Sequence, residues 1–192
     1  MAPKELIVVG GPNGAGKTTF ADEYVARHGC NYVGADAIAA QLSPDDPANA
    51  QIAASREFLR QVDMAIADSA SFVVESTLSG RTFRRLLGKA RDAEFQVTIV
   101  YLFLDSADMC VNRVYERVQA GGHDVPEADI RRRFVRSVHN FWNLYRPLAD
   151  HWLLIHNSSN QPQDVAVGTA AEFSIRDAER FSQFQLLINS DP

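Results

Sequence analysis

The chain has 192 residues, 46% of them hydrophobic, and this length and composition predict a single domain over residues 1–192. Its 19 lysines and arginines are outnumbered by 24 aspartates and glutamates, which gives a formal net charge of −5. A surface of this sign disfavours nucleic acid as the main partner. No run has the length of a membrane span and the amino end lacks a signal-peptide core, so we expect a cytoplasmic protein with no membrane partner.

Strand and helix signals alternate along the chain, a pattern typical of an α/β fold with a mostly parallel sheet flanked by helices. Strands are predicted at residues 6–9, 31–33, 71–75, 95–104 and 151–156. Helices are predicted at residues 17–28, 48–70, 81–92, 105–120 and 126–145, with a proline-rich loop at 44–47. After residue 162 we expect an extended piece at 164–170 and a helix at 175–187. The stretch 95–104 is the most apolar and is expected to be the central strand.

Two details of these elements can be tested. The 48–70 helix is expected to bury an apolar face that includes Ile52, Phe58, Val62, Met64 and Ile66. The two cysteines, Cys30 and Cys110, are too few and too far apart for a disulfide framework or a zinc site. We expect both to be packing residues.

A phosphate-binding motif follows the first predicted strand, because residues 11–18 read Gly-Pro-Asn-Gly-Ala-Gly-Lys-Thr. The residues expected to bind nucleotide phosphate are Gly11, Pro12, Asn13, Gly14, Ala15, Gly16, Lys17, Thr18 and Thr19. Lys17 would reach the β- and γ-phosphates, and the Thr18 hydroxyl is the expected Mg²⁺ ligand. A glycine-rich turn can also simply join a strand to a helix, but the full spacing favours a nucleoside triphosphate. The motif does not separate a kinase from an ATPase or a GTPase.

Three acidic residues lie at or just after the ends of predicted strands, and the carboxyl ends of parallel strands open onto the crevice of such a sheet. Asp36 could accept or orient the proton of a substrate hydroxyl, or it could cap the helix that begins at residue 37. Glu75 could serve the magnesium ion or a substrate, or it could form a structural ion pair. For Asp105 a helix cap is the favoured interpretation.

Arginines flank a Gly-Gly pair further along the chain. Arg113 and Arg117 are one helical turn apart, and residues 121–122 separate them from the arginines at 131–133 and Arg136. A glycine hinge between Arg-bearing helices predicts a lid over about 113–136 that closes on phosphate. His123 in the hinge could contact a substrate. The alternative is a solvated surface on which these arginines pair with Glu116, Asp124, Glu127 and Asp129.

Several motifs together resemble the zeta toxin-type kinases. The resemblance is carried, in order, by residues 10–19, 34–38, 75–80, 101–104 and 121–127 with the arginines that follow. It covers roughly the first three quarters of the chain, so it is more specific than the phosphate-binding loop alone. The chain is shorter than typical toxin members, and its Gly-Gly-His-Asp-Val-Pro segment marks a compact branch of the group.

The resemblance implies a P-loop kinase fold in which ATP, with Mg²⁺, donates its γ-phosphate to a small-molecule acceptor. The best-known members phosphorylate a sugar hydroxyl of UDP-N-acetylglucosamine. By resemblance, Lys17 is the phosphate-binding lysine and Asp36 the general base, and Glu75 and Thr77 line the acceptor site. Arg117 and one arginine of 131–133 belong to the lid. An antitoxin protein is a further expected partner of such kinases, although one sequence cannot reveal it.

For the second lid arginine we take Arg132 as the candidate. Two alternatives to a sugar kinase stay open. The acceptor could be a hydroxyl of another metabolite, a nucleoside or an antibiotic. A different class would be a nucleotide-binding switch that acts through a protein partner, although the chain lacks the Asn-Lys-x-Asp motif that reads guanine and a hinged Arg lid suits group transfer better.

Overall fold

The computed structural model describes residues 3–43, 49–159 and 161–189. The loop predicted at 44–47 therefore lies outside the described residues. The strands are β1 (Glu5–Gly10), β2 (Asn31–Val33), β3 (Phe72–Ser76), β4 (Gln96–Phe103), β5 (His151–His156), β6 (Gln163–Gly168) and β7 (Phe173–Ile175). The helices are α1 (Lys17–His28), α2 (Ala35–Leu42), α3 (Gln51–Ala67), α4 (Phe83–Asp92), α5 (Ala107–Gln119), α6 (Glu127–Asn140) and α7 (Ala178–Asn189). Helix α6 continues into a π-helical turn, η1 (Phe141–Tyr145), and a 3₁₀ turn, η2 (Arg146–Leu148).

The strands form one sheet in the order β2-β3-β1-β4-β5-β6-β7. The pairings from β2 to β5 are parallel, whereas β6 and β7 extend the sheet in antiparallel fashion. Strand β4 lies in the middle of this order and is almost wholly buried, as its apolar sequence predicted. The expected mostly parallel sheet flanked by helices is confirmed.

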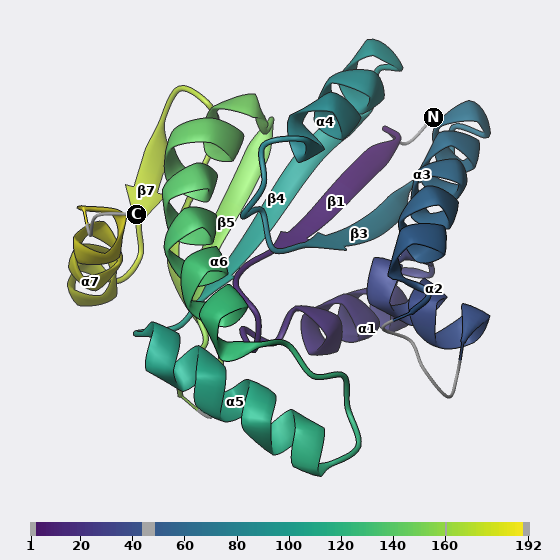
Figure 1. The fold of residues 1–192 in the computed structure, drawn as a ribbon. Coiled ribbons are helices and arrows are strands. Elements are labelled where there is room, and N and C mark those ends of the chain that lie inside the picture. Colours follow the sequence, from purple (N-terminus) through teal and green to yellow (C-terminus); the bar gives the residue numbers. More distant parts are fainter. Residues whose placement is uncertain (1–2, 44–48, 160, 190–192) are drawn as a thin grey trace.

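The carboxyl ends of the parallel strands point to one edge of the sheet, where the chain turns from β1 into α1 (Figure 1). Helix α5 lies beyond this edge, and α4 and α6 cross one face of the sheet (Figure 1). This arrangement brings segments that are far apart in sequence to a common edge. None of the helices within the described residues is long and apolar enough to cross a membrane.

The buried face of α3 differs from the expected one. Val62 is buried and Phe58 and Ile66 are partly buried against the core, as expected, but Ile52 is 73% exposed and Met64 is 49% exposed. The other buried positions are Ala54 and Ala65. Helix α3 packs against α2 and β2 near the edge of the sheet, so only a narrow stripe of its surface is covered. Hydrophobic periodicity alone overestimated the width of that stripe.

The chain after residue 162 continues the sheet before it forms a helix. Residue Ile175, predicted to begin a helix, lies in β7 instead, and α7 begins at Ala178. Helix α7 packs on α6 through Phe184, whose ring lies 6.2 Å from the rings of Tyr101 and Phe141. The tail therefore completes the hydrophobic core beside β4 and α6.

Both cysteines are free thiols, as expected. Cys110 is buried in α5, and burial raises the pKa of its thiol to about 12. Cys30 is partly exposed before β2.

Candidate active site

The phosphate-binding loop connects β1 to α1 in a conformation that needs glycine. Gly11, Gly14 and Gly16 have φ values of 147°, 78° and 87°, which side chains on L-residues rarely allow. A Cβ on Gly11 would also lie 2.3 Å from the carbonyl oxygen of Leu102. Behind the loop, Asn157 Nδ2 donates a hydrogen bond of 2.8 Å to the Ala15 carbonyl. The loop is thus built as the motif predicts, at the amino end of a helix.

Lys17 is the first residue of α1 and turns back over the loop, where its Nζ donates to the Pro12 carbonyl at 2.9 Å. Burial lowers the pKa of this ammonium, while the carboxylates of Glu75 and Asp36 raise it. Beside it, the Asn13 side-chain oxygen is buried and has no hydrogen-bond partner within the described chain. The Lys17 ammonium and the backbone N–H groups of the loop fit an anionic ligand, and the Asn13 oxygen would accept a hydrogen bond from a donor on that ligand.

Glu75 lies at the carboxyl end of β3, beside the loop. One of its carboxylate oxygens accepts a hydrogen bond from the Thr18 hydroxyl at 3.1 Å, and the other accepts from the Tyr32 hydroxyl. Burial and the bond to Glu75 both raise the pKa of Tyr32. Among the described residues Glu75 has no ion pair, so its recorded partners are two hydroxyl groups rather than a structural cation.

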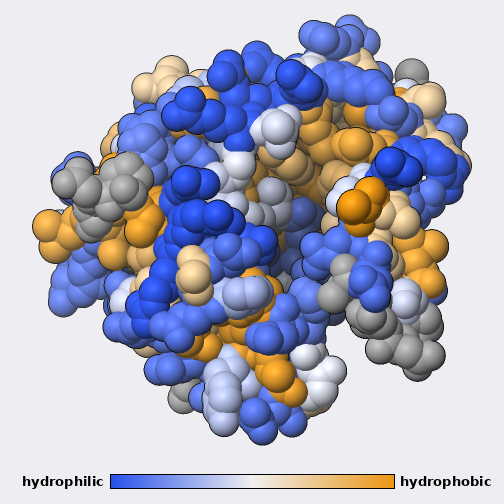
Figure 2. All heavy atoms as spheres, viewed as in Figure 1, coloured by the Kyte–Doolittle hydropathy of each residue, from blue (hydrophilic) through white to orange (hydrophobic). Residues whose placement is uncertain are grey.

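A cavity of about 520 Å³ gathers half of the expected site residues. Figure 2 shows a hollow between α6 on one side and α2 and α3 on the other, with mainly hydrophilic residues on the α6 side and both hydrophobic and hydrophilic residues on the opposite side. The expected residues that line the cavity are Asn13, Lys17, Thr18, Asp36, Glu75, Thr77 and Arg117. The further lining residues that bear on its chemistry are Asp22, Tyr32, His123 and Arg133. Thr19 is exposed and does not belong to the lining.

Asp36 faces this cavity from the first turn of α2. The helix begins at Ala35 with Gly34 in the N-cap position, and no side chain makes a capping hydrogen bond there. The alternative in which Asp36 caps a helix beginning at residue 37 is therefore wrong. An exposed carboxylate in the first turn leaves its oxygens available to a ligand.

The arginines of the predicted lid differ in whether they line the cavity, and pairing with an acid does not separate the two groups, because Arg133 lines the cavity and also lies 3.6 Å from Asp129. Arg117 and Arg133 line the cavity, and Arg117 also donates to the His123 carbonyl at 2.6 Å. Arg132, the candidate we chose, does not line the cavity and pairs with Asp129 at 2.8 Å. Successive helix positions are rotated by about 100°, so only one of three neighbouring arginines can face a given side.

Arg131 forms ion pairs with Asp108 and Glu127, at 2.7 Å each. For Arg131 the alternative interpretation, a solvated surface on which arginines pair with acids, is therefore correct. Arg113 faces the phosphate-binding loop from α5 and donates to the Ser158 carbonyl at 3.4 Å.

Side chains of α6 and η1 hold the segment that carries Thr77. Ser137 donates to the Thr77 carbonyl, Asn140 Nδ2 donates to the carbonyls of Leu78 and Ser79 at 3.0 Å each, and the Tyr145 hydroxyl donates to the next carbonyl, that of Gly80. Sequence reasoning missed this support, as it missed Tyr32. The only signal in the sequence for this support was that Ser137 and Asn140 are polar residues at positions where the helical period requires burial.

Asp105 has a different role from the expected one. Ser106 occupies the N-cap of α5, and its side chain accepts from the Met109 amide. Asp105 instead lies 2.7 Å from the ring of His156, which is buried at the end of β5. The ends of β4 and β5 meet here. Asn157, the residue after His156, supports the phosphate-binding loop.

Comparisons with known proteins agree with this geometry. A family model described as an AAA domain matches residues 6–135. An uncharacterized protein of Haemophilus influenzae is 31% identical over 127 residues, which cover 65% of this chain and 88% of that protein.

Three solved structures share the fold. The AvrRxo1-ORF1:-ORF2 complex with ATP matches with a TM-score of 0.71 at 18% identity, covering 95% of this chain but only 63% of that one. The PezAT chromosomal toxin-antitoxin system of Streptococcus pneumoniae matches with a TM-score of 0.63 at 14% identity, and the match covers 98% of this chain and 87% of that one. A gluconokinase from Sinorhizobium meliloti matches with a TM-score of 0.53 at 15% identity, and the match covers 82% of this chain and 84% of that one. The resemblance to zeta toxin-type kinases is thereby confirmed for the fold. Because the family match runs from β1 into α6, this chain belongs to the AAA domain family and has a P-loop kinase-like fold.

Proposed function

We propose that this protein is an ATP-dependent kinase that transfers the γ-phosphate of ATP to a hydroxyl group of a small acceptor. The observation that carries the proposal is the single cavity that contains both Lys17, on the phosphate-binding loop, and the Asp36 carboxylate, on α2. Phosphoryl transfer needs a cationic cradle for phosphate and a group that orients the attacking hydroxyl. These two requirements are met on neighbouring elements of one pocket.

The donor site fits a nucleoside triphosphate. The backbone N–H groups of Asn13, Gly14 and Gly16 and the Lys17 ammonium would hold the phosphates, and Thr18 would share a magnesium ion with them. Within the described residues, no group of three or more His, Cys, Asp or Glu side chains is arranged so that it could hold a metal ion by itself. A magnesium ion held by one hydroxyl, nearby Glu75 and nucleotide phosphates is the usual arrangement for kinases. Bound magnesium would neutralise charge on the transferred phosphate.

The acceptor site would lie between Asp36 and Thr77. In the proposed mechanism Asp36 orients the acceptor hydroxyl and takes its proton, and Glu75 and Thr77 position the acceptor. Arg117 and, from its place in the lining, Arg133 rather than Arg132 would stabilise charge on the transferred group. We propose a sugar-containing acceptor, such as a nucleotide sugar, because of the resemblance to zeta toxin-type kinases. An antitoxin-like protein partner is proposed on the same ground, since the PezAT structure is of a toxin-antitoxin system.

The donor half of the proposal is tested by Lys17→Ala, with Lys89→Ala as the control. Lys89 is exposed on α4 and pairs with Asp63, away from the cavity. ATP consumption should be measured with a panel of nucleotide sugars, free sugars and nucleosides. We expect Lys17→Ala to lose at least about 100-fold in turnover with little change in thermal stability. Wild-type turnover in Lys17→Ala would refute the assignment.

The acceptor half is tested by Asp36→Asn, with Asp68→Asn as the control at the exposed end of α3. The amide keeps the shape of the side chain but cannot take a proton. We expect ATP binding to persist, measured by calorimetry, and phosphate transfer to be lost. If Asp36→Asn transfers phosphate as fast as the wild type, Asp36 has no role in proton transfer. If no acceptor in the panel supports turnover but ATP changes the affinity of a protein partner, the switch alternative is correct.

A further inference from the structure

A second cavity lies on α4, away from the candidate active site. It has a volume of about 450 Å³ and lies between α4 and the turn that carries Leu148. Its lining residues are Arg81, Arg84, Arg85, Leu87, Gly88, Arg91 and Leu148, none of which lines the active-site cavity. Nothing in the proposed kinase mechanism uses it.

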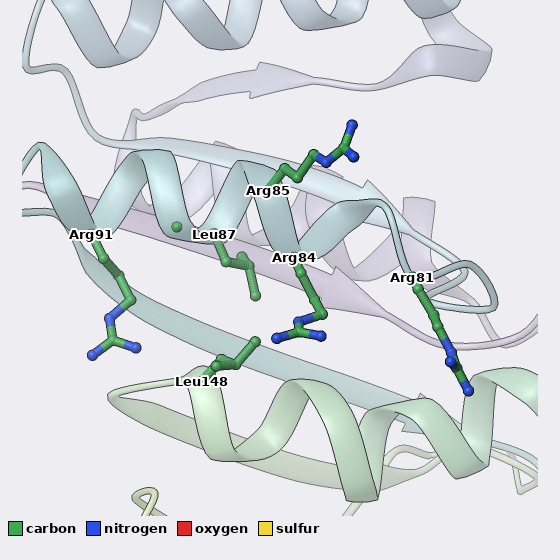
Figure 3. A pocket seen from close by; sticks show the side chains of 7 residues that line it. Arg81, Arg84, Arg85, Leu87, Arg91 and Leu148 are labelled. Carbon is green, nitrogen blue, oxygen red and sulfur yellow. The ribbon is translucent and has the colours of Figure 1, made fainter.

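Three arginines lie on one side of this space. Arg84 and Arg91 are seven residues apart on α4, two helical turns, and Arg81 lies in the bend just before the helix. Figure 3 shows Arg84 and Arg91 projecting from α4 toward the segment that carries Leu148, with Leu87 pointing toward Leu148 between them. Gly88 adds no side chain, and a Cβ there would meet no atom within 4 Å. The result is a hollow with cationic walls and an apolar floor.

No acidic residue of the described chain lines this hollow, although Glu94 and Asp150 line a neighbouring pocket together with Arg91. From residue 77 to residue 91 the sequence contains five basic residues and no acidic one. Several other helical arginines pair with an acid one turn away, as in the pairs Arg60–Glu57 and Arg132–Asp129. For Arg81, Arg84 and Arg91, no ion pair or side-chain hydrogen bond with any described residue is recorded. Their mutual repulsion destabilises the patch unless an anion binds.

The chemistry of the hollow selects the class of anion. Planar guanidinium groups bind phosphate oxygens in a bidentate manner. Arg84 and Arg91 are separated by about 10 Å of helix, at a rise of about 1.5 Å per residue, and Arg81 lies before the helix begins, so the arginines spread over more space than one phosphate group fills. The leucine floor fits an apolar or aromatic body, and the volume falls in the range of small-molecule sites. We propose that this hollow binds a multiply phosphorylated molecule at a site separate from the phosphate-binding loop.

The test uses the Lys17→Ala protein, so that binding at the loop is suppressed. The probe is inorganic tripolyphosphate, measured by calorimetry at about 0.15 M salt, where the Debye length is about 8 Å and diffuse attraction is screened. Adding R84E and R91E should weaken binding by roughly tenfold or more. The matched control adds R27E and R56E, which change the net charge equally on exposed positions of α1 and α3 outside the hollow. Circular dichroism melting verifies that each variant is folded.

The outcomes separate the possibilities. Selective loss in the R84E/R91E protein supports the proposal, whereas equal loss in both double variants, or no tripolyphosphate binding at all, overturns it. A short single-stranded oligothymidylate and ADP, tested in the same way, distinguish a nucleic-acid strand from a free nucleotide as the natural source of the phosphates. Equally tight binding of a polyglutamate peptide would show that the hollow recognises acidic protein and would overturn the phosphate assignment. These experiments measure binding and not kinase activity. The proposed kinase function and the proposed phosphate site can therefore fail independently of each other.

Discussion

Asn140 offers a direct test of how the fold positions the candidate acceptor site. Its amide donates to the carbonyls of Leu78 and Ser79 at 3.0 Å each, and the residue is buried in α6. Leu78 has a φ of 54°, in the left-handed region that side chains disfavour. The hydrogen bonds from Asn140 hold this strained segment, and Thr77 is the residue before it. Asn140→Ala should therefore loosen the segment as well as destabilise the protein.

The size of the effect follows from the lost contacts. A hydrogen bond contributes about 0.5–1.5 kcal/mol net, and a buried partner left unsatisfied costs about 1–3 kcal/mol. With two carbonyls affected, we expect the free energy of unfolding to fall by about 2–4 kcal/mol. For a domain of this size about 1 kcal/mol shifts Tm by about 2–4 °C, so a decrease of about 5–15 °C is expected.

Asn143→Ala is the matched control, because Asn143 also donates to a backbone carbonyl, that of His139, but is exposed. That substitution should cost less than about 0.5 kcal/mol. Both variants should be compared by urea unfolding, and their turnover measured under conditions in which both are folded. If Asn140→Ala and Asn143→Ala have the same unfolding free energy, the carbonyl contacts do not stabilise the segment and the reasoning fails.

Tyr32→Phe removes one of the two hydroxyl donors to Glu75 and should lower turnover by up to about tenfold with little change in Tm; turnover equal to the wild type would show that Tyr32 only packs. Because burial lowers the pKa of Lys17, the cation should lose its charge at a lower pH than an ordinary lysine, so triphosphate affinity should fall as pH rises through that lowered pKa. Calorimetry across the alkaline range checks this, and affinity that stays constant up to the ordinary lysine pKa contradicts it. Since burial raises the pKa of Cys110 to about 12, iodoacetamide near neutral pH should alkylate Cys30 first, as followed by peptide mass spectrometry; equally fast labelling of native Cys110 would refute its burial.

The local elements were largely predictable from the sequence. The glycine pattern and the apolar run before it predicted β1, the loop and α1, and the helix ends at His28 before Gly29 as expected. The apolar stretch in β4 predicted a central strand because only a strand covered on both faces can be so hydrophobic. Periodicity failed where coverage is partial, as for Ile52 on α3, because the pattern does not tell how much of a helix face its neighbours cover.

The site was predictable in its parts but not in its assembly. Residue type and motif spacing singled out Lys17, Asp36 and Glu75, since each follows a strand whose carboxyl end must face the same edge. Which of three successive arginines faces the cavity depends on the rotation of α6 against the sheet, and the structure gives Arg133 rather than Arg132. That rotation is set by contacts with distant elements.

The sequence by itself determined the chemistry that is confined to one short segment, above all the phosphate-binding loop, because glycine conformations and a helix amino end are local properties. Only the tertiary structure decided which distant groups meet: the Tyr32 hydroxyl on Glu75, the Asn140 amide behind Thr77, and Asp105 against His156 instead of at a helix cap. These contacts join residues separated by about 40 to 60 positions. Their formation depends on the packing of the whole sheet and its helices, which no local pattern records.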